Sequence, residues 1–74
     1  MTEPEWIDMD SSNVESAAYD PDAEVIYVRF QEGGAYAYDQ CPPHVWAEFT
    51  APGQSAGKYV NSTLKDKPCH KLDI

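Results

Sequence analysis

Four side chains near the middle of the chain combine aromatic rings with a guanidinium group, a set that can bind planar ligands. They are Tyr27, Arg29, Tyr36 and Tyr38. Aromatic side chains on a sheet face stack nucleobases, and an arginine plane can stack or pair with phosphate. The alternative interpretation is that the tyrosines pack in the core or across strands, with their hydroxyls at its edge. The choice depends on which face of a predicted sheet carries them.

Residues 24–39 predict a β-hairpin. The first arm, EVIYVRF, is rich in β-branched and aromatic residues, which favour strands. Gly33 and Gly34 can adopt the positive φ angle that a tight hairpin turn requires. The second arm, residues 35–39, alternates small and aromatic side chains with the period of a strand.

The length of the hairpin loop decides the two faces. A loop of Gly33 and Gly34 alone places Arg29 opposite Tyr38, whereas a loop of residues 31–34 places Arg29 opposite Tyr36. Both loops separate the same two sets of side chains: Tyr27, Arg29, Tyr36 and Tyr38 on one face, and Ile26, Val28, Phe30 and Ala37 on the other. A three- or five-residue loop reverses this, because a one-residue slip moves each side chain through the sheet. We expect an even loop, since it separates an aliphatic face from an aromatic one.

The complete pattern predicts an α+β fold, in which a three-stranded antiparallel β-meander is followed by two short helices packed on one face. Residues 14–19 form the first strand, and residues 20–23 form a turn. Pro42 and Pro43 end the third strand, and a helix covers residues 44–49. A second helix runs from residue 55 to about residue 64. Residues 65–74 are polar and contain Pro68, so we expect them to be irregular.

Length and charge limit the classes of function. The 74 residues predict one domain, residues 11–74, after an acidic tail of residues 1–10. The sequence contains no signal peptide and no apolar run of the roughly 20 residues that span a bilayer, so we expect a cytoplasmic protein that does not bind membranes. Residues 1–57 hold eleven acidic side chains and one base, whereas residues 58–74 hold four lysines and two aspartates. This acidic body repels phosphate backbones at long range.

A second candidate site lies where the second helix begins, at Ser55-Ala56-Gly57-Lys58. Free backbone N–H groups at such a junction can hold a phosphate or a carboxylate. The alternative is that Ser55 caps the helix and Gly57 permits close packing. Lys58 and Lys65 are the basic side chains that we expect to assist a ligand on the tyrosine face.

Metal and catalytic chemistry are not predicted. The metal-capable residues are Cys41, His44, Cys69 and His70, but adjacent side chains such as Cys69 and His70 tend to diverge. The two cysteines are expected to be free thiols, with a disulfide as the alternative. No nucleophile elbow, triad spacing or metalloprotease motif is present, so we predict neither an enzyme nor a cofactor.

An ordered set of short motifs spans residues 11–67. It consists of Ser12-Asn13-Val14, Ala18-Tyr19-Asp20, Val28-x-Phe30, Gly34-x-Tyr36-x-Tyr38, Pro42 and Ser55-x-Gly57-Lys58-Tyr59-x-Asn61-x-x-Leu64-Lys65. The set resembles the KTSC domain family, named for the C-terminal extension of some lysyl-tRNA synthetases and also found as small free-standing bacterial or phage proteins. A central Tyr-x-Tyr is its hallmark. Members often carry a further aromatic shortly after the position of Lys65, where this chain has Pro68-Cys69. The resemblance implies the predicted fold, and RNA binding has been proposed for the family.

Two functions follow as hypotheses. The first is a non-catalytic module that binds RNA or a nucleotide-type ligand on the tyrosine face. The second is an acidic protein–protein interaction module, a phage-type inhibitor or nucleic-acid mimic, that binds a basic protein surface. The charge favours the second, the family resemblance favours the first, and self-association is compatible with both.

Overall fold

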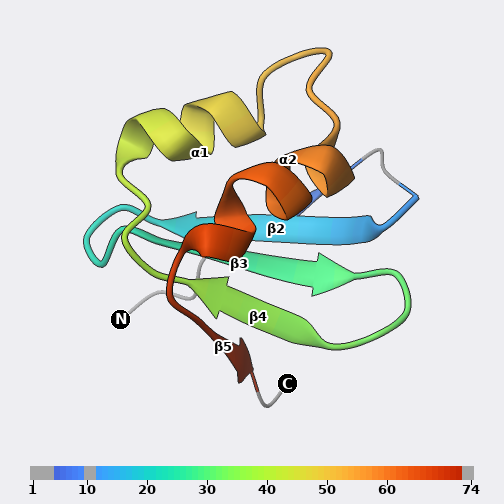
Figure 1. The fold of residues 1–74 in the computed structure, drawn as a ribbon, viewed down its shortest axis with the longest axis horizontal. Coiled ribbons are helices and arrows are strands. Elements are labelled where there is room, and N and C mark those ends of the chain that lie inside the picture. Colours follow the sequence, from blue (N-terminus) through green and yellow to red (C-terminus); the bar gives the residue numbers. More distant parts are fainter. Residues whose placement is uncertain (1–4, 10–11, 73–74) are drawn as a thin grey trace.

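A five-stranded antiparallel sheet forms one layer of the structure, a computed structural model that describes residues 5–9 and 12–72. The strands follow one another in chain order: β1 (Ile7–Asp8), β2 (Val14–Asp20), β3 (Val25–Phe30), β4 (Ala35–Tyr38) and β5 (Cys69–Leu72). The second layer consists of α1 (Pro43–Phe49), α2 (Ala56–Ser62) and the 3₁₀ turn η1 (Leu64–Asp66). Figure 1 shows both helices above the same face of the sheet. The predicted α+β class and the covering helices are therefore confirmed.

The prediction of three strands is wrong, because a short strand is added at each edge. β1, within the predicted tail, is two residues long and pairs with Ser16 and Ala17 of β2. β5 pairs along the whole of β4, from Ala35 opposite Leu72 to Tyr38 opposite Cys69. The sequence prediction had assigned residues 1–10 to a tail and residues 65–74 to irregular structure. Each becomes a strand because it meets the unpaired backbone groups of an existing sheet edge.

The hairpin between β3 and β4 has a three-residue loop, Gln31 to Gly33, so the predicted even loop is wrong. The Phe30 amide donates to the Gly34 carbonyl oxygen at 3.0 Å, and the Gly33 amide donates to the Phe30 carbonyl oxygen at 3.0 Å. Gly33 has a φ angle of 105°. A left-handed glycine at this position is typical of three-residue hairpin loops.

The odd loop reverses the second arm of the hairpin. Ile26 lies opposite Tyr38 and Val28 opposite Tyr36, whereas Tyr27 lies opposite Ala37. Residues directly opposite one another share a face, so Tyr36 and Tyr38 lie on the aliphatic side. We call the side that α1 and α2 cover the helix face, and the other side the open face.

Both helices begin as the sequence predicts. Pro43 occupies the first turn of α1, and Ser55 is the N-cap of α2. The second helix is shorter than expected, because it changes to the 3₁₀ turn after Thr63, where the Lys67 amide donates to the Leu64 carbonyl oxygen at 2.9 Å. Lys67 is extended, as the residue before a proline prefers.

The core lies between the helix face and the two helices. Its largest fully buried side chains include Ile26, Val28, Phe49 and Leu64. The rings of Phe49 and Tyr59 lie 5.6 Å apart, which joins α1 to α2. Within the described ranges, neither helix is long and apolar enough to cross a membrane.

Candidate functional site

The four residues of the predicted stacking platform do not share a face, so that prediction is wrong. Tyr38 is a core residue with an exposed fraction of 6%, and Tyr36 packs against the core. The ring of Tyr36 meets the ring of Phe30 edge to face, with 5.8 Å between the centroids. Burial raises the pKa of Tyr38 to about 12, and Cys69 and Tyr36 add to the shift. The Tyr-x-Tyr pair therefore packs against the helices.

Tyr27 and Arg29 lie on the open face, where they meet a residue that the sequence prediction did not include. The guanidinium carbon of Arg29 lies 4.7 Å from the centroid of the Trp6 ring, and the rings of Trp6 and Tyr27 are 6.3 Å apart. A cation over a tryptophan face is attracted by the electron density of the ring. β1 brings Trp6 to this position. The signal in the sequence was a lone tryptophan in an acidic segment.

Apart from Tyr27 and Arg29, the positions of β2, β3 and β4 on the open face carry small side chains. Two cross-strand rows define it: Ala18, Tyr27, Ala37 and His70 in one, and Ser16, Arg29, Ala35 and Leu72 in the other. Ser16 is buried, and its hydroxyl has no hydrogen-bond partner among the described residues. The large side chains are thus grouped around Arg29.

The predicted junction at the start of α2 is a helix cap. The hydroxyl oxygen of Ser55 accepts a hydrogen bond from the Lys58 amide at 3.5 Å. Gly57 is buried against Asn13, because a Cβ built on Gly57 would lie 3.0 Å from Asn13 Nδ2. The side chains of Lys58 and Lys65 are exposed. The capping and close-packing interpretation of Ser55 and Gly57 is confirmed.

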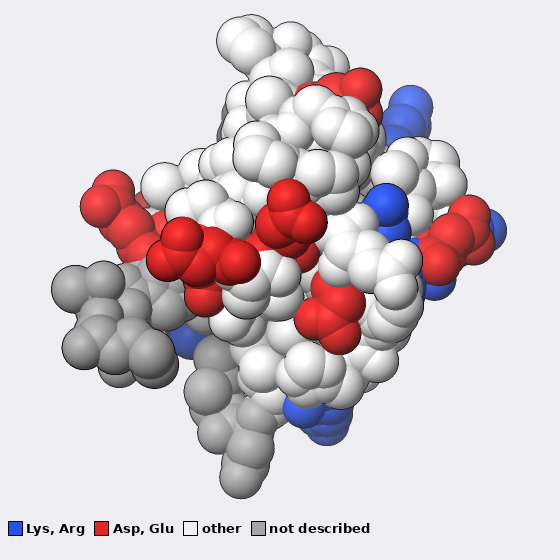
Figure 2. All heavy atoms as spheres, turned by 90° about the vertical axis from the view of Figure 1, so that its left-hand side faces the viewer, with Lys and Arg blue, Asp and Glu red and all other residues white. Residues whose placement is uncertain are grey.

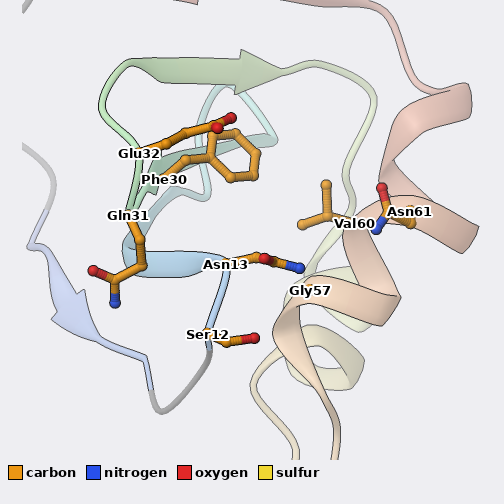
Figure 3. Close-up of a pocket in the computed structure, with 8 residues that line it drawn as sticks. All are labelled: Ser12, Asn13, Phe30, Gln31, Glu32, Gly57, Val60 and Asn61. Carbon is orange, nitrogen blue, oxygen red and sulfur yellow. The ribbon is translucent and has the colours of Figure 1, made fainter.

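A pocket of about 470 Å³ opens beside Gly57, and we call it the hairpin pocket. Three segments line it. Ser12 and Asn13 precede and join β2; Phe30, Gln31 and Glu32 come from the β3–β4 hairpin; Gly57, Val60 and Asn61 come from α2. Figure 3 shows Phe30 and Glu32 extending from the hairpin towards α2, while Asn13 points to Gly57 and Gln31 points away from the helix. Phe30 and Val60 are the large apolar residues of its lining, most of the other lining residues are polar, and no lysine or arginine of the described residues lines it.

The sequence prediction missed the hairpin pocket as a site. Ser12, Asn13, Gly57 and Asn61 belong to the quoted motifs, but no pattern showed that they meet. The contact arises because the approach to β2 and the first turns of α2 lie at the same end of the sheet (Figure 1).

Four carboxylate residues gather at the opposite end of the sheet, and we call this group the acidic end. It consists of Asp20, Asp22, Glu24 and Asp39. Figure 2 shows this side of the molecule with acidic side chains spread across it and basic side chains mostly towards its margins. One Asp20 oxygen accepts hydrogen bonds from the amides of Asp22 (3.0 Å) and Ala23 (3.2 Å), which orders the β2–β3 turn.

The negative charges of the acidic end help to raise the pKa of two neighbouring side chains, Tyr19 and Cys41. Burial raises the pKa of the Tyr19 hydroxyl, and the charges of Glu24 and Asp20 raise it further. Burial also raises the pKa of the Cys41 thiol; Lys67 opposes this shift, while Asp39 and Glu24 add to it. The Tyr19 hydroxyl donates to the Cys41 carbonyl oxygen at 2.7 Å, so both groups are held at this end.

The cysteine and histidine residues do not form a cluster. Cys41 is buried, and its thiol donates to the carbonyl oxygens of Tyr38 and Asp39 at 3.4 Å each. Cys69 is exposed on β5, and both cysteines are free thiols. In the described part of the chain, no three Cys, His, Asp or Glu residues are grouped so as to hold a metal ion.

Comparisons with known proteins agree on one family. The model of the KTSC domain matches residues 10–67. A protein from Tsukamurella paurometabola is 36% identical over 59 residues, which cover 80% of this chain and 87% of the relative. A protein from Stutzerimonas stutzeri is 32% identical over 57 residues, covering 77% of this chain and 79% of the relative. The crystal structure of a KTSC domain protein from Yersinia pestis superposes with a TM-score of 0.88 at 26% identity, over 96% of this chain and all of the other.

Proposed function

This chain belongs to the KTSC domain family, and we propose that it acts as a non-catalytic protein-interaction module that binds a basic surface on another protein. The observation that carries the proposal is the charge of the molecule. The net charge is −8, and eleven of the thirteen acidic residues fall in residues 1–57 beside a single base. A surface of one sign raises the rate at which an oppositely charged partner is met.

The acidic end is the part of this surface that we assign to the partner. Its carboxylates are held by the β2–β3 turn and by the end of β4. The turn is ordered by the Asp20 side chain, so part of the charge pattern is preformed. Preformed charges lose less entropy when a partner binds than charges on a free loop do.

Binding of RNA or a nucleotide stays a prediction. The four-residue stacking platform that motivated it does not form, because its residues lie on two faces. Tyr36 and Tyr38 pack towards the helices, and the face of Arg29 is occupied by Trp6. The acidic body opposes a phosphate backbone at every distance shorter than the screening length. These features favour the protein partner. A cytoplasmic location remains part of the proposal.

The proposal is tested by affinity capture from a bacterial lysate with and without nuclease, followed by measurement of the association rate with the captured protein. We expect capture to survive nuclease treatment. We also expect association to slow by about tenfold or more between low and high salt, since steered encounter depends on unscreened charge. The dissociation rate should change less.

A double substitution, Asp22→Asn with Glu24→Gln, should slow association at low salt. The control is Glu5→Gln with Glu15→Gln, which removes the same charge from exposed positions outside the acidic end. Equal slowing by both doubles would assign the effect to net charge rather than to the acidic end. If nuclease treatment abolishes capture, the partner is a nucleic acid and not a protein.

A further inference from the structure

We infer that the hairpin pocket holds the guanidinium group of an arginine side chain from a protein partner. The inference extends the proposed function, on which the assignment to a protein chain rests, but it concerns the end of the sheet opposite the acidic end. It names a site and a ligand group that the surface charge alone does not specify.

The pocket is large enough to admit a side chain with a flat end, and part of its lining is apolar. A volume of about 470 Å³ falls within the roughly 300–1,000 Å³ of ordinary ligand sites. Phe30 and Val60 give the pocket an apolar surface, and Gly57 contributes backbone without a side chain. The Phe30 ring is fixed by its edge-to-face contact with Tyr36. A fixed, partly exposed aromatic ring is a surface on which a planar cation packs.

The polar part of the lining suits a cation with several N–H donors. Glu32 supplies a carboxylate, and Figure 3 shows it on the same side of the pocket as the Phe30 ring. Asn61 supplies a carboxamide from α2 on the other side. A carboxylate accepts hydrogen bonds without donating any. No described lysine or arginine lines the pocket, and the Lys71 side chain lies outside this lining, beside Gly34. Glu32 would repel a phosphate or carboxylate ligand, because both groups are negatively charged.

Guanidinium fits these features better than ammonium does. It is planar, carries five N–H donors in a fixed fork, is weakly hydrated, and stacks on aromatic rings. A lysine ammonium is compact and strongly hydrated, so it gains less from the Phe30 ring. The pocket should therefore select arginine over lysine, whereas the acidic end should attract either residue.

The back wall of the pocket is preformed. Gln31 joins the hairpin to the start of β2, because its amide donates to the Asn13 carbonyl oxygen at 2.9 Å. Asn13 in turn lies against Gly57, where a Cβ would stand only 3.0 Å from its amide nitrogen. The residues that precede β2 thus contact both the hairpin and α2, so these three segments lose little conformational entropy when a ligand binds.

The test is a titration of the ¹⁵N-labelled protein with four small probes, followed by NMR. The probes are N-acetyl-arginine amide, the matching citrulline and lysine compounds, and free arginine. We expect the arginine amide to shift the Glu32 and Gly33 backbone signals and the Asn61 side-chain signal. Citrulline has the same shape without the charge and should bind at least about tenfold more weakly. The lysine compound should bind about threefold or more weakly.

Two variants check the residues of the site. Glu32→Gln should weaken binding of the arginine amide by about fivefold, whereas Glu15→Gln, an exposed acidic residue outside the pocket, should leave it unchanged. Phe30→Leu should reduce the preference for arginine over lysine, and the dispersion of the spectrum shows whether that variant still folds.

Three results would overturn the inference. One is equal binding of arginine and lysine compounds with shifts confined to the acidic end, which leaves the proposed function intact. Another is equal binding of citrulline and arginine. The third is tighter binding of free arginine than of the capped amide, which would point to a metabolite instead of a protein chain. A different outcome separates the two proposals. If the pocket selects arginine but no basic protein is captured, arginine binding in the hairpin pocket is supported and the proposed function is contradicted.

Discussion

The two faces of the sheet use the same kinds of residue for different purposes. On the helix face, Tyr38 is 6% exposed and packs with Ile26 and the helices. On the open face, Tyr27 remains half-buried beside Trp6 and Arg29. Both positions are tyrosines in strands, β3 and β4, so residue type does not distinguish them. The difference shows that one hairpin loop decides the role of a tyrosine. An odd number of loop residues places Tyr38 in the core, whereas an even number would place it on the open face.

The largest expected effect separates the two tyrosines. Tyr38→Ala should lower the free energy of unfolding by about 3–5 kcal/mol, because it removes a large side chain from a closed core. Tyr27→Ala should lower it by about 1 kcal/mol or less, the usual range for a cross-strand contact at a surface. Urea unfolding followed by circular dichroism measures both. Similar losses for the two variants would mean that the faces do not differ as described.

A second test concerns the tyrosine that ties the helices together. The Tyr59 hydroxyl donates to a Glu48 carboxylate oxygen at 2.8 Å, and Tyr59→Phe should cost about 1–2 kcal/mol, the usual range for a hydrogen bond to a charged group. Glu48→Gln, which keeps an acceptor, is the matched control and should cost less.

The same bond predicts a loss of stability at alkaline pH. Burial, then the hydrogen bond and the charge of Glu48, raise the pKa of Tyr59 to about 12, whereas a tyrosine in an unfolded chain titrates near 10. The unfolded state therefore releases its proton first as pH rises. The contribution of Tyr59 is fully present below about pH 10 and is lost between about pH 10 and pH 12. Tyr59→Phe should flatten this part of the stability curve. An unchanged curve would assign the alkaline loss to the other groups whose pKa is raised, such as Tyr38, to about 12, and Tyr19.

A substitution in the β3–β4 loop, which decides the face of each β4 side chain, should have a smaller effect on stability. Gly33 has a φ angle of 105°, and a Cβ built on it meets nothing within 4 Å. Gly33→Ala should therefore destabilise the hairpin by about 1–2 kcal/mol through backbone strain alone. Ala23→Gly, in an exposed turn that already lacks this strain, controls for the general effect of glycine in a loop. A neutral Gly33→Ala would argue against the three-residue loop.

The smallest expected effect tests the open face. Trp6→Ala removes the ring over Arg29 and beside Tyr27, and should cost about 0.5–1 kcal/mol, as cation–aromatic contacts at exposed sites do. Tryptophan fluorescence should also lose the component of Trp6 and keep that of Trp46, which stacks on Tyr19 with 5.4 Å between the ring centroids. A loss as large as that of Tyr38→Ala would show that the open face is a second core.

Local patterns in the sequence were sufficient for most elements of the fold. The β-branched and aromatic run of residues 25–30 predicts β3, and Pro43 and Ser55 mark the starts of α1 and α2. The ordered motifs identified the family that the comparisons then showed. These signals are reliable because propensity, proline geometry and capping act over a few neighbouring residues.

Tertiary structure alone decided the faces, the edges and the pocket. Adding or removing one residue in the hairpin loop inverts every side chain of β4, and both parities satisfied the local pattern of Gly33 and Gly34. β1 and β5 exist because a sheet edge was available to pair with them. The hairpin pocket brings together segments more than 40 residues apart, since Asn13 meets Gly57. Each of these outcomes depends on contacts between distant segments, which local preferences do not encode.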